Sequence, residues 1–187
     1  MARPATRVLL PAAVVAATAL LAACDSGTPA AGGAATTSQT SSSAAPTTAV
    51  AAPPASVEPA KDGDCPYLER AWVAEANGQK VSKVRLSADQ PNPACFFYGL
   101  DGKEQLRARV YVGDAKAAKA LVDQAAPVET SSRAELAGGW KGGSMPTQDG
   151  SVFAVAREGK AVVVRSNQTT TFKAKRVAER AIQTLGL

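Results

Sequence analysis

The chain has 187 residues, 45% of them hydrophobic and 20% charged, and its 21 lysines and arginines against 16 acids give a net charge of +5. It contains no histidine, which excludes a histidine-based catalytic triad, a histidine metal site and an ordinary imidazole acid–base group. It also carries no Gly-x-Ser-x-Gly elbow, phosphate-binding loop, dinucleotide fingerprint or zinc-ligand spacing. We therefore expect a protein that is not an enzyme and that uses no cofactor or metal.

Residues 1–23 have the pattern of a bacterial export signal. A short start with two arginines is followed by an apolar run from Val8 to Leu21. This run of about 14 residues is too short for a bilayer span, which needs about 20, but it suits the apolar region of a signal peptide. The sequence Leu21-Ala22-Ala23-Cys24 at its end resembles the lipobox of bacterial lipoproteins.

The lipobox resemblance implies how the mature protein is held. A signal peptidase would cut before Cys24, and the thiol of Cys24 would carry a diacylglyceryl group. Two or three acyl chains anchor a protein stably where one chain does not. The expected location is the extracytoplasmic face of the cell membrane, with membrane lipid as the partner of Cys24. The alternative is a secreted protein in which Cys24 is incidental.

Residues 24–60 are expected to form a disordered linker behind the anchor. They are mostly Ala, Thr, Ser, Pro and Gly, without an aromatic residue, and cannot bury enough apolar surface to offset the entropy of ordering. About 36 such residues span roughly 30–36 Å on average, which would hold a globular head away from the membrane. The Ser and Thr residues suit either an O-glycosylated stalk or an unmodified spacer. The Ala, Pro and Arg bias indicates a GC-rich genome, as in actinobacteria.

Residues 61–187 have the size of one globular domain and contain two cysteines, Cys65 and Cys95. In an exported protein an even pair favours a disulfide. The competing interpretation is a redox-active thiol pair. The chain has no Cys-x-x-Cys motif and no histidine to tune a thiolate, so we favour the structural bridge.

The hydrophobic periodicity of this domain predicts helices and strands in alternating groups. Asp64-Cys65-Pro66 is typical of a helix start and Asn77-Gly78 of a helix end. We expect a loop up to Leu136 and no regular element in the glycine-rich segment around Trp140. The expected helices are 65–77, 114–126 and 171–185, and the expected strands are 80–86, 94–98, 106–112, 151–156 and 160–166.

These elements indicate an α+β fold. Hairpins, rather than single strands alternating with helices, predict an antiparallel sheet with about three helices packed on it. The sheet would be made of two halves, each a helix followed by strands, and one disulfide would join the first helix to the second strand.

A basic sheet face is the first candidate binding site. Strand alternation places Arg107, Arg109 and Tyr111 on the side that faces away from the core. A small antiparallel sheet with few helices leaves part of one face uncovered, so the other basic strand residues, Lys83, Arg85 and Arg165, are expected there too. One interpretation is an ordinary solvated face that prevents aggregation. The other is attraction to anionic envelope material such as phospholipid headgroups or acidic polysaccharide, with no nucleic acid as partner.

Two further features are candidates for binding. The last predicted helix carries a basic stripe of Lys173, Arg176 and Arg180, which suits either solvation or docking. Trp140 lies between two glycine pairs. It would serve as an exposed platform for a partner or glycan, or else fold back to cover an end of the sheet.

Several segments of the domain form a pattern: Cys65-Pro66-Tyr67-Leu68, Trp72 to Gln79, Pro93 to Tyr98, Val110 to Asp114, Gly138-Gly139-Trp140, Asn167-Gln168 and the terminal Leu185-Gly186-Leu187. Together they resemble a family of actinobacterial lipoprotein domains of unknown function. The resemblance covers nearly all of the chain after the linker and implies no catalytic residues.

The leading functional hypothesis is a membrane-anchored, non-catalytic domain that binds or organises an anionic envelope polymer or another envelope protein. The alternative is a carrier of lipid or another apolar ligand, which requires a substantial apolar cavity. A third hypothesis, an envelope hydrolase, requires acidic side chains that converge in a cleft.

Overall fold

The computed structural model describes residues 52–187. The predicted signal peptide, Cys24 and the linker up to residue 51 lie outside the described residues. The strands are β1 (Lys61–Asp62), β2 (Lys83–Leu86), β3 (Cys95–Tyr98), β4 (Glu104–Val112), β5 (Ser132–Leu136), β6 (Trp140–Thr147), β7 (Gly150–Arg157) and β8 (Lys160–Ser166), and the helices are α1 (Arg70–Asn77), α2 (Ala115–Ala125) and α3 (Thr171–Leu185).

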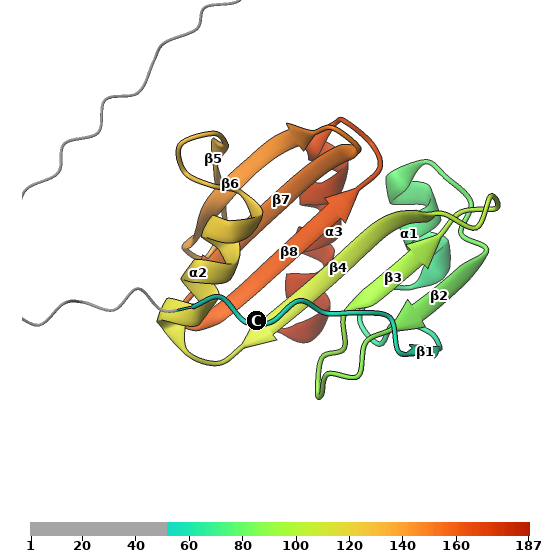
Figure 1. Ribbon diagram of the computed structural model, residues 1–187, viewed down its shortest axis with the longest axis horizontal. Helices are drawn as coiled ribbons and strands as arrows, with labels where there is room; N and C mark the ends of the chain where they lie inside the picture. The colour runs from blue at the N-terminus through green and yellow to red at the C-terminus, as the bar shows by residue number, and fades with distance from the viewer. Residues whose placement is uncertain (1–51) are drawn as a thin grey trace, which may run out of the picture. The chain divides into compact units, whose positions relative to one another are not determined.

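All the strands form one antiparallel sheet, which confirms the predicted α+β fold. The sheet has eight strands in the order β1-β2-β3-β4-β8-β7-β6-β5 (Figure 1). The two predicted halves meet where β8 returns beside β4, with Leu106 opposite Ser166 and Val112 opposite Lys160. The halves therefore share one continuous sheet.

The helices lie on opposite faces of this sheet. α1 and α3 cover one face, and α2 covers part of the other (Figure 1). Because successive strand residues point to opposite faces, β7 and β8 supply apolar side chains to both layers. Phe153 and Val164 pack in the α1/α3 layer, whereas Val152 and Val163 pack under α2.

The start of α1 differs from the prediction. The helix begins at Arg70 rather than at Cys65, while its end at Asn77 and the left-handed Gly78 is as expected. Residues Cys65 and Tyr67 before the helix are both buried, and the Tyr67 hydroxyl donates to backbone carbonyls of the sheet region. These contacts hold residues 64–69 along the sheet and delay the first helical turn.

The segment 132–147 is a second difference. Instead of a loop, it forms the β5–β6 hairpin, with Gly138 and Gly139 at positive φ in the turn. A Cβ on Gly142 would lie only 2.0 Å from the Ala154 carbonyl oxygen of β7. Glycine at this position allows two strand backbones to approach closely, so the glycine-rich pattern reflects packing rather than a loop.

The N-terminal strap, residues 52–60, belongs to the segment that the composition predicts to be a disordered linker. It instead crosses the sheet on the side that carries α2 (Figure 1, teal) and leads into β1. Val57 is only 8% exposed and packs with Ala94 and Phe96, and the Ala60 amide donates to the Leu86 carbonyl at 2.8 Å. One well-placed valine and these backbone contacts order a segment whose composition alone predicts disorder.

Tyr67 gives a testable contribution to stability. Its hydroxyl donates to the carbonyl oxygens of Pro93 at 2.9 Å and Ala108 at 3.2 Å. We expect Tyr67→Phe to lower the free energy of unfolding by about 1–2 kcal/mol at pH 7, because a buried hydrogen-bond donor is lost. Chemical denaturation measures this loss.

The same tyrosine predicts a pH effect. Burial raises the pKa of Tyr67 above its usual value of about 10. The folded state therefore holds this proton at a pH where the unfolded state releases it, so its stabilising contribution is complete below about pH 10 and falls as the pH rises further. The Tyr67→Phe variant should lose less stability than the wild type between pH 9 and 11. Equal losses in the two proteins would contradict the raised pKa of Tyr67.

Candidate functional site

The strand register brings the predicted basic residues onto one face of the sheet. Arg85 on β2 lies opposite Phe96 on β3, which lies opposite Arg107 on β4, which in turn lies opposite Arg165 on β8. Arg109 follows two residues after Arg107 and therefore shares its face. The sequence-based grouping of these residues is consistent with the register.

Some of these cations are engaged within the domain. Arg107 donates from Nε and Nη2 to the two carboxylate oxygens of Glu104, both at 3.0 Å, and lies 4.7 Å from the centre of the Phe96 ring. Arg85 Nε lies 3.0 Å from Asp62 Oδ1. Lys83, farther along the face, lies 5.4 Å above the Tyr98 ring. These contacts serve local structure.

Arg165 and Arg109 differ from them. Among the described residues, neither forms an ion pair with an acid. Burial and the neighbouring positive charge of Arg107 lower the pKa of Arg165, and Glu104 opposes this effect. Burial also lowers the pKa of Arg109, opposed by Asp89 and Tyr111. Both guanidinium groups thus lose hydration without gaining a carboxylate partner.

These arginines line a pocket of about 320 Å³, which we call the arginine pocket. Arg107, Arg109 and Arg165 come from the sheet, and Leu121 and Gln124 come from α2. The strap closes the remaining side with Ser56 and Val57, and the Ala55 carbonyl accepts a hydrogen bond from Arg109 Nη2 at 2.8 Å. No pattern in the sequence indicates that the strap borders this site.

The pocket has the chemistry of an anion site. Guanidinium groups present several N–H donors in a planar fork that matches phosphate and carboxylate oxygens. Arg107 and Arg165 lie directly opposite each other on neighbouring strands, where like charges are destabilising. An anion between them would offset that repulsion.

Tyr111 and Trp140 do not line this pocket. Tyr111 shares the face, but its hydroxyl accepts a hydrogen bond from the Asp114 amide at 3.2 Å, beside the start of α2. Trp140 is only 1% exposed and packs in the α1/α3 layer, with the Arg157 guanidinium 5.2 Å from its ring. Trp140 is therefore not an exposed platform, and the folded-back alternative describes it.

The basic stripe on α3 is largely used within the fold. Lys173 Nζ donates to the Asn77 carbonyl at 2.9 Å and thereby caps the C-terminus of α1. The guanidinium of Arg180 lies 5.6 Å from the Trp72 ring. Arg176 is exposed and makes no ion pair among the described residues.

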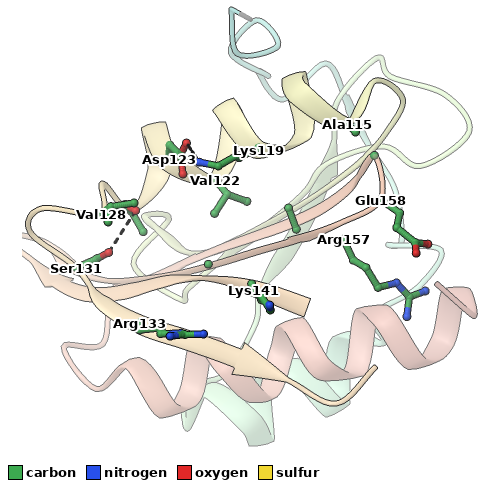
Figure 2. A pocket seen from close by; sticks show the side chains of 14 residues that line it. Ala115, Lys119, Val122, Asp123, Val128, Ser131, Arg133, Lys141, Arg157 and Glu158 are labelled. Atoms are coloured by element: carbon green, nitrogen blue, oxygen red, sulfur yellow. Dashed lines mark hydrogen bonds and ion pairs between the residues drawn. The ribbon is translucent and has the colours of Figure 1, made fainter. Parts of the chain in front are cut away.

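A larger hollow, absent from the sequence-based predictions, lies between α2 and strands β5–β7. This groove beneath α2 has a volume of about 450 Å³ (Figure 2). Val122 points from α2 toward the sheet, and Arg133 and Lys141 lie on the strands below it (Figure 2). Its lining combines small and charged residues that lie far apart in the chain, which no local pattern groups together.

The predicted disulfide is present between Cys65 and Cys95. Cys24, the predicted lipid anchor, lies outside the described residues. Within residues 52–187, none of the helices combines the length and the hydropathy that crossing a bilayer requires.

The described residues thus define a class: a disulfide-bonded α+β domain built on one antiparallel sheet. Residues 46–187 match the family model described as Domain of unknown function (DUF2020). This match covers more than half of the chain, so the protein belongs to that family. The match also begins ahead of the predicted boundary at residue 61, which is consistent with an ordered strap. No curated protein matches the chain in a sequence comparison.

Proposed function

We propose that this protein is a membrane-anchored lipoprotein whose extracytoplasmic domain binds an anionic envelope component without catalysing a reaction. The observation that carries the proposal is Arg165, which lies beside Arg107 in a pocket and has no acid of its own among the described residues. A bound anion supplies the missing negative charge, and Arg109 adds a third guanidinium.

The anchor is the second part of the proposal. The apolar run from Val8 to Leu21 and the lipobox-like sequence ending at Cys24 support export and acylation. The disulfide between Cys65 and Cys95 supports an oxidising compartment, because such bonds are rare in the cytosol. The composition supports an actinobacterial source. Membrane lipid is then the first partner of the protein.

The anchor predicts the behaviour of a Cys24→Ser variant. In bacteria fed an alkyne-tagged palmitate, the wild type should take up the label and fractionate with membranes. Cys24→Ser should lose the label and leave the membrane fraction, since no thiol remains to receive the diacylglyceryl group. A Ser26→Ala control should behave as the wild type, and membrane retention of unlabelled Cys24→Ser would refute the anchor.

The arginine pocket predicts salt-dependent binding of anions. We expect Arg165→Gln to weaken co-sedimentation with phosphatidylglycerol vesicles, or retention on an acidic polysaccharide, by about tenfold at low salt, because an unpaired charge is lost. The two probes separate headgroup recognition from polysaccharide recognition. Stability should change little, since Arg165 makes no ion pair among the described residues.

The matched control for that experiment is Arg176→Gln, which removes an exposed arginine from the opposite face of the sheet. It should leave binding nearly unchanged. Equal weakening by both variants would mean that net charge, rather than the pocket, attracts the anion. Unchanged binding in Arg165→Gln would refute the role of the pocket.

A further inference from the structure

The groove beneath α2 is a fixed hollow, because both ends of the helix are held close to the sheet. At one end, a Cβ on Gly143 of β6 would lie 3.0 Å from the Ala126 Cβ and 2.3 Å from Ser131 Oγ. At the other, a Cβ on Gly159 would lie 2.3 Å from the Gly113 carbonyl oxygen, just before the helix. Glycines thus permit close contact at both ends, and the space between them stays open.

The walls of the groove are mainly apolar. Val122 and Ala126 line it from α2, and Ala156 lines it from β7. Gly142 adds a stretch of strand without a side chain. Val128 stands at the rim and is 72% exposed, so it extends the apolar wall to the mouth of the groove.

Two of the cations that line the groove, Lys141 and Arg157, form no ion pair within the described residues. Lys119 pairs with Asp123 on α2, and Arg133 pairs with Glu135 on β5. Lys141 lines the groove and forms no ion pair within residues 52–187.

Two other charged residues at the groove do not neutralise Lys141. The side chains of Arg157 and Glu158 extend away from the hollow (Figure 2). Glu135 lies directly opposite Lys141 on β5 but is paired with Arg133. Since Arg157 extends away, Lys141 is the cation at the apolar groove that has no ion pair within residues 52–187.

We propose that the groove beneath α2 binds a single-chain amphiphile with one carboxylate, such as a fatty acid. The acyl chain lies against Val122, Ala126 and Ala156, and the carboxylate pairs with Lys141. A hollow of about 450 Å³ whose exposed wall is mainly apolar falls in the range of 300–1,000 Å³ typical of small-ligand sites. This site is separate from the arginine pocket, and the inference does not depend on anion binding there.

The test is calorimetric titration of the full chain with dodecanoate below its micelle concentration. All samples carry Cys24→Ser, so that no acyl group of the protein competes for the groove. We expect dodecanoate to bind, its methyl ester to bind at least tenfold more weakly, and dodecylammonium not to bind. Absence of dodecanoate binding, or equal affinity for acid and ester, would overturn the proposal.

Variants locate the ligand. Ala156→Leu fills the hollow and should weaken the binding of dodecanoate at least tenfold. Lys141→Glu should remove the preference for the acid over the ester. Val128→Asp changes only an exposed rim residue and should weaken the binding of both dodecanoate and its methyl ester. This variant keeps the test decisive if Ala156→Leu does not fold. Arg176→Gln, an exposed change on α3 at the opposite face of the sheet, is the matched control and should bind as the wild type does. Unchanged binding in folded Ala156→Leu or in Val128→Asp would place the ligand elsewhere.

Discussion

Replacing Trp140 by alanine is expected to lower the free energy of unfolding by about 3–5 kcal/mol. The indole is 1% exposed and lies at the start of β6, opposite Leu136 of β5. Its removal leaves a cavity in the α1/α3 layer that the sheet cannot close without moving β5. The Arg157 guanidinium also loses the aromatic face 5.2 Å away.

Urea unfolding followed by circular dichroism measures this effect. Phe172→Ala is the matched control, because Phe172 is also aromatic but is 61% exposed on α3. The control should change stability by less than about 0.5 kcal/mol, as surface substitutions usually do. Similar losses in both variants would contradict the buried position of Trp140.

Removing the disulfide is expected to lower the free energy of unfolding by an amount similar to the loss in Trp140→Ala. The bond joins residues 30 positions apart, and a loop of that length contributes roughly 3–4 kcal/mol, largely through the unfolded state in the chain-entropy model. It fixes the non-helical segment before α1 to β3, where both cysteines are buried. Cys65→Ser with Cys95→Ser should therefore unfold at a clearly lower urea concentration.

A reducing agent provides the internal comparison for the disulfide. Reduced wild type should approach the stability of the double variant, and the double variant should not respond to the reductant. Cys24→Ser should keep the full stability of the wild type, since the predicted anchor takes no part in the bridge. A double variant as stable as the oxidised wild type would refute a structural role for the bond.

The parts of the fold that the sequence predicts well have strong local signals. Alternation of apolar and polar residues marks β4, the Glu158-Gly159 turn marks the β7–β8 hairpin, and an Asp114 cap begins α2. The β5–β6 hairpin lacked such a signal, because glycines needed for close strand packing look like glycines of a loop. The start of α1 at Arg70 has no local signal, because it depends on Tyr67, which is held by carbonyls far away in the chain.

The same distinction between local signals and long-range packing applies to the candidate sites. Strand alternation is enough to place Arg107 and Arg109 on one face. Which of the cations remain unpaired depends on the register and on side chains such as Glu104 and Asp62, which sequence alone does not assign as partners. The groove beneath α2 arises from packing between segments that are far apart in the chain, so it becomes visible only in three dimensions.

The strap has a mechanical consequence. Everything upstream of residue 52 joins the domain through the strap, whose first hydrogen bond to the domain is made by the Ala55 carbonyl with Arg109 of the arginine pocket. A pull from the N-terminal side therefore loads the hydrogen bond between Arg109 and Ala55 before it reaches Val57 or the backbone bond at Ala60. The point at which the domain takes up force from the upstream chain is also an edge of its arginine pocket.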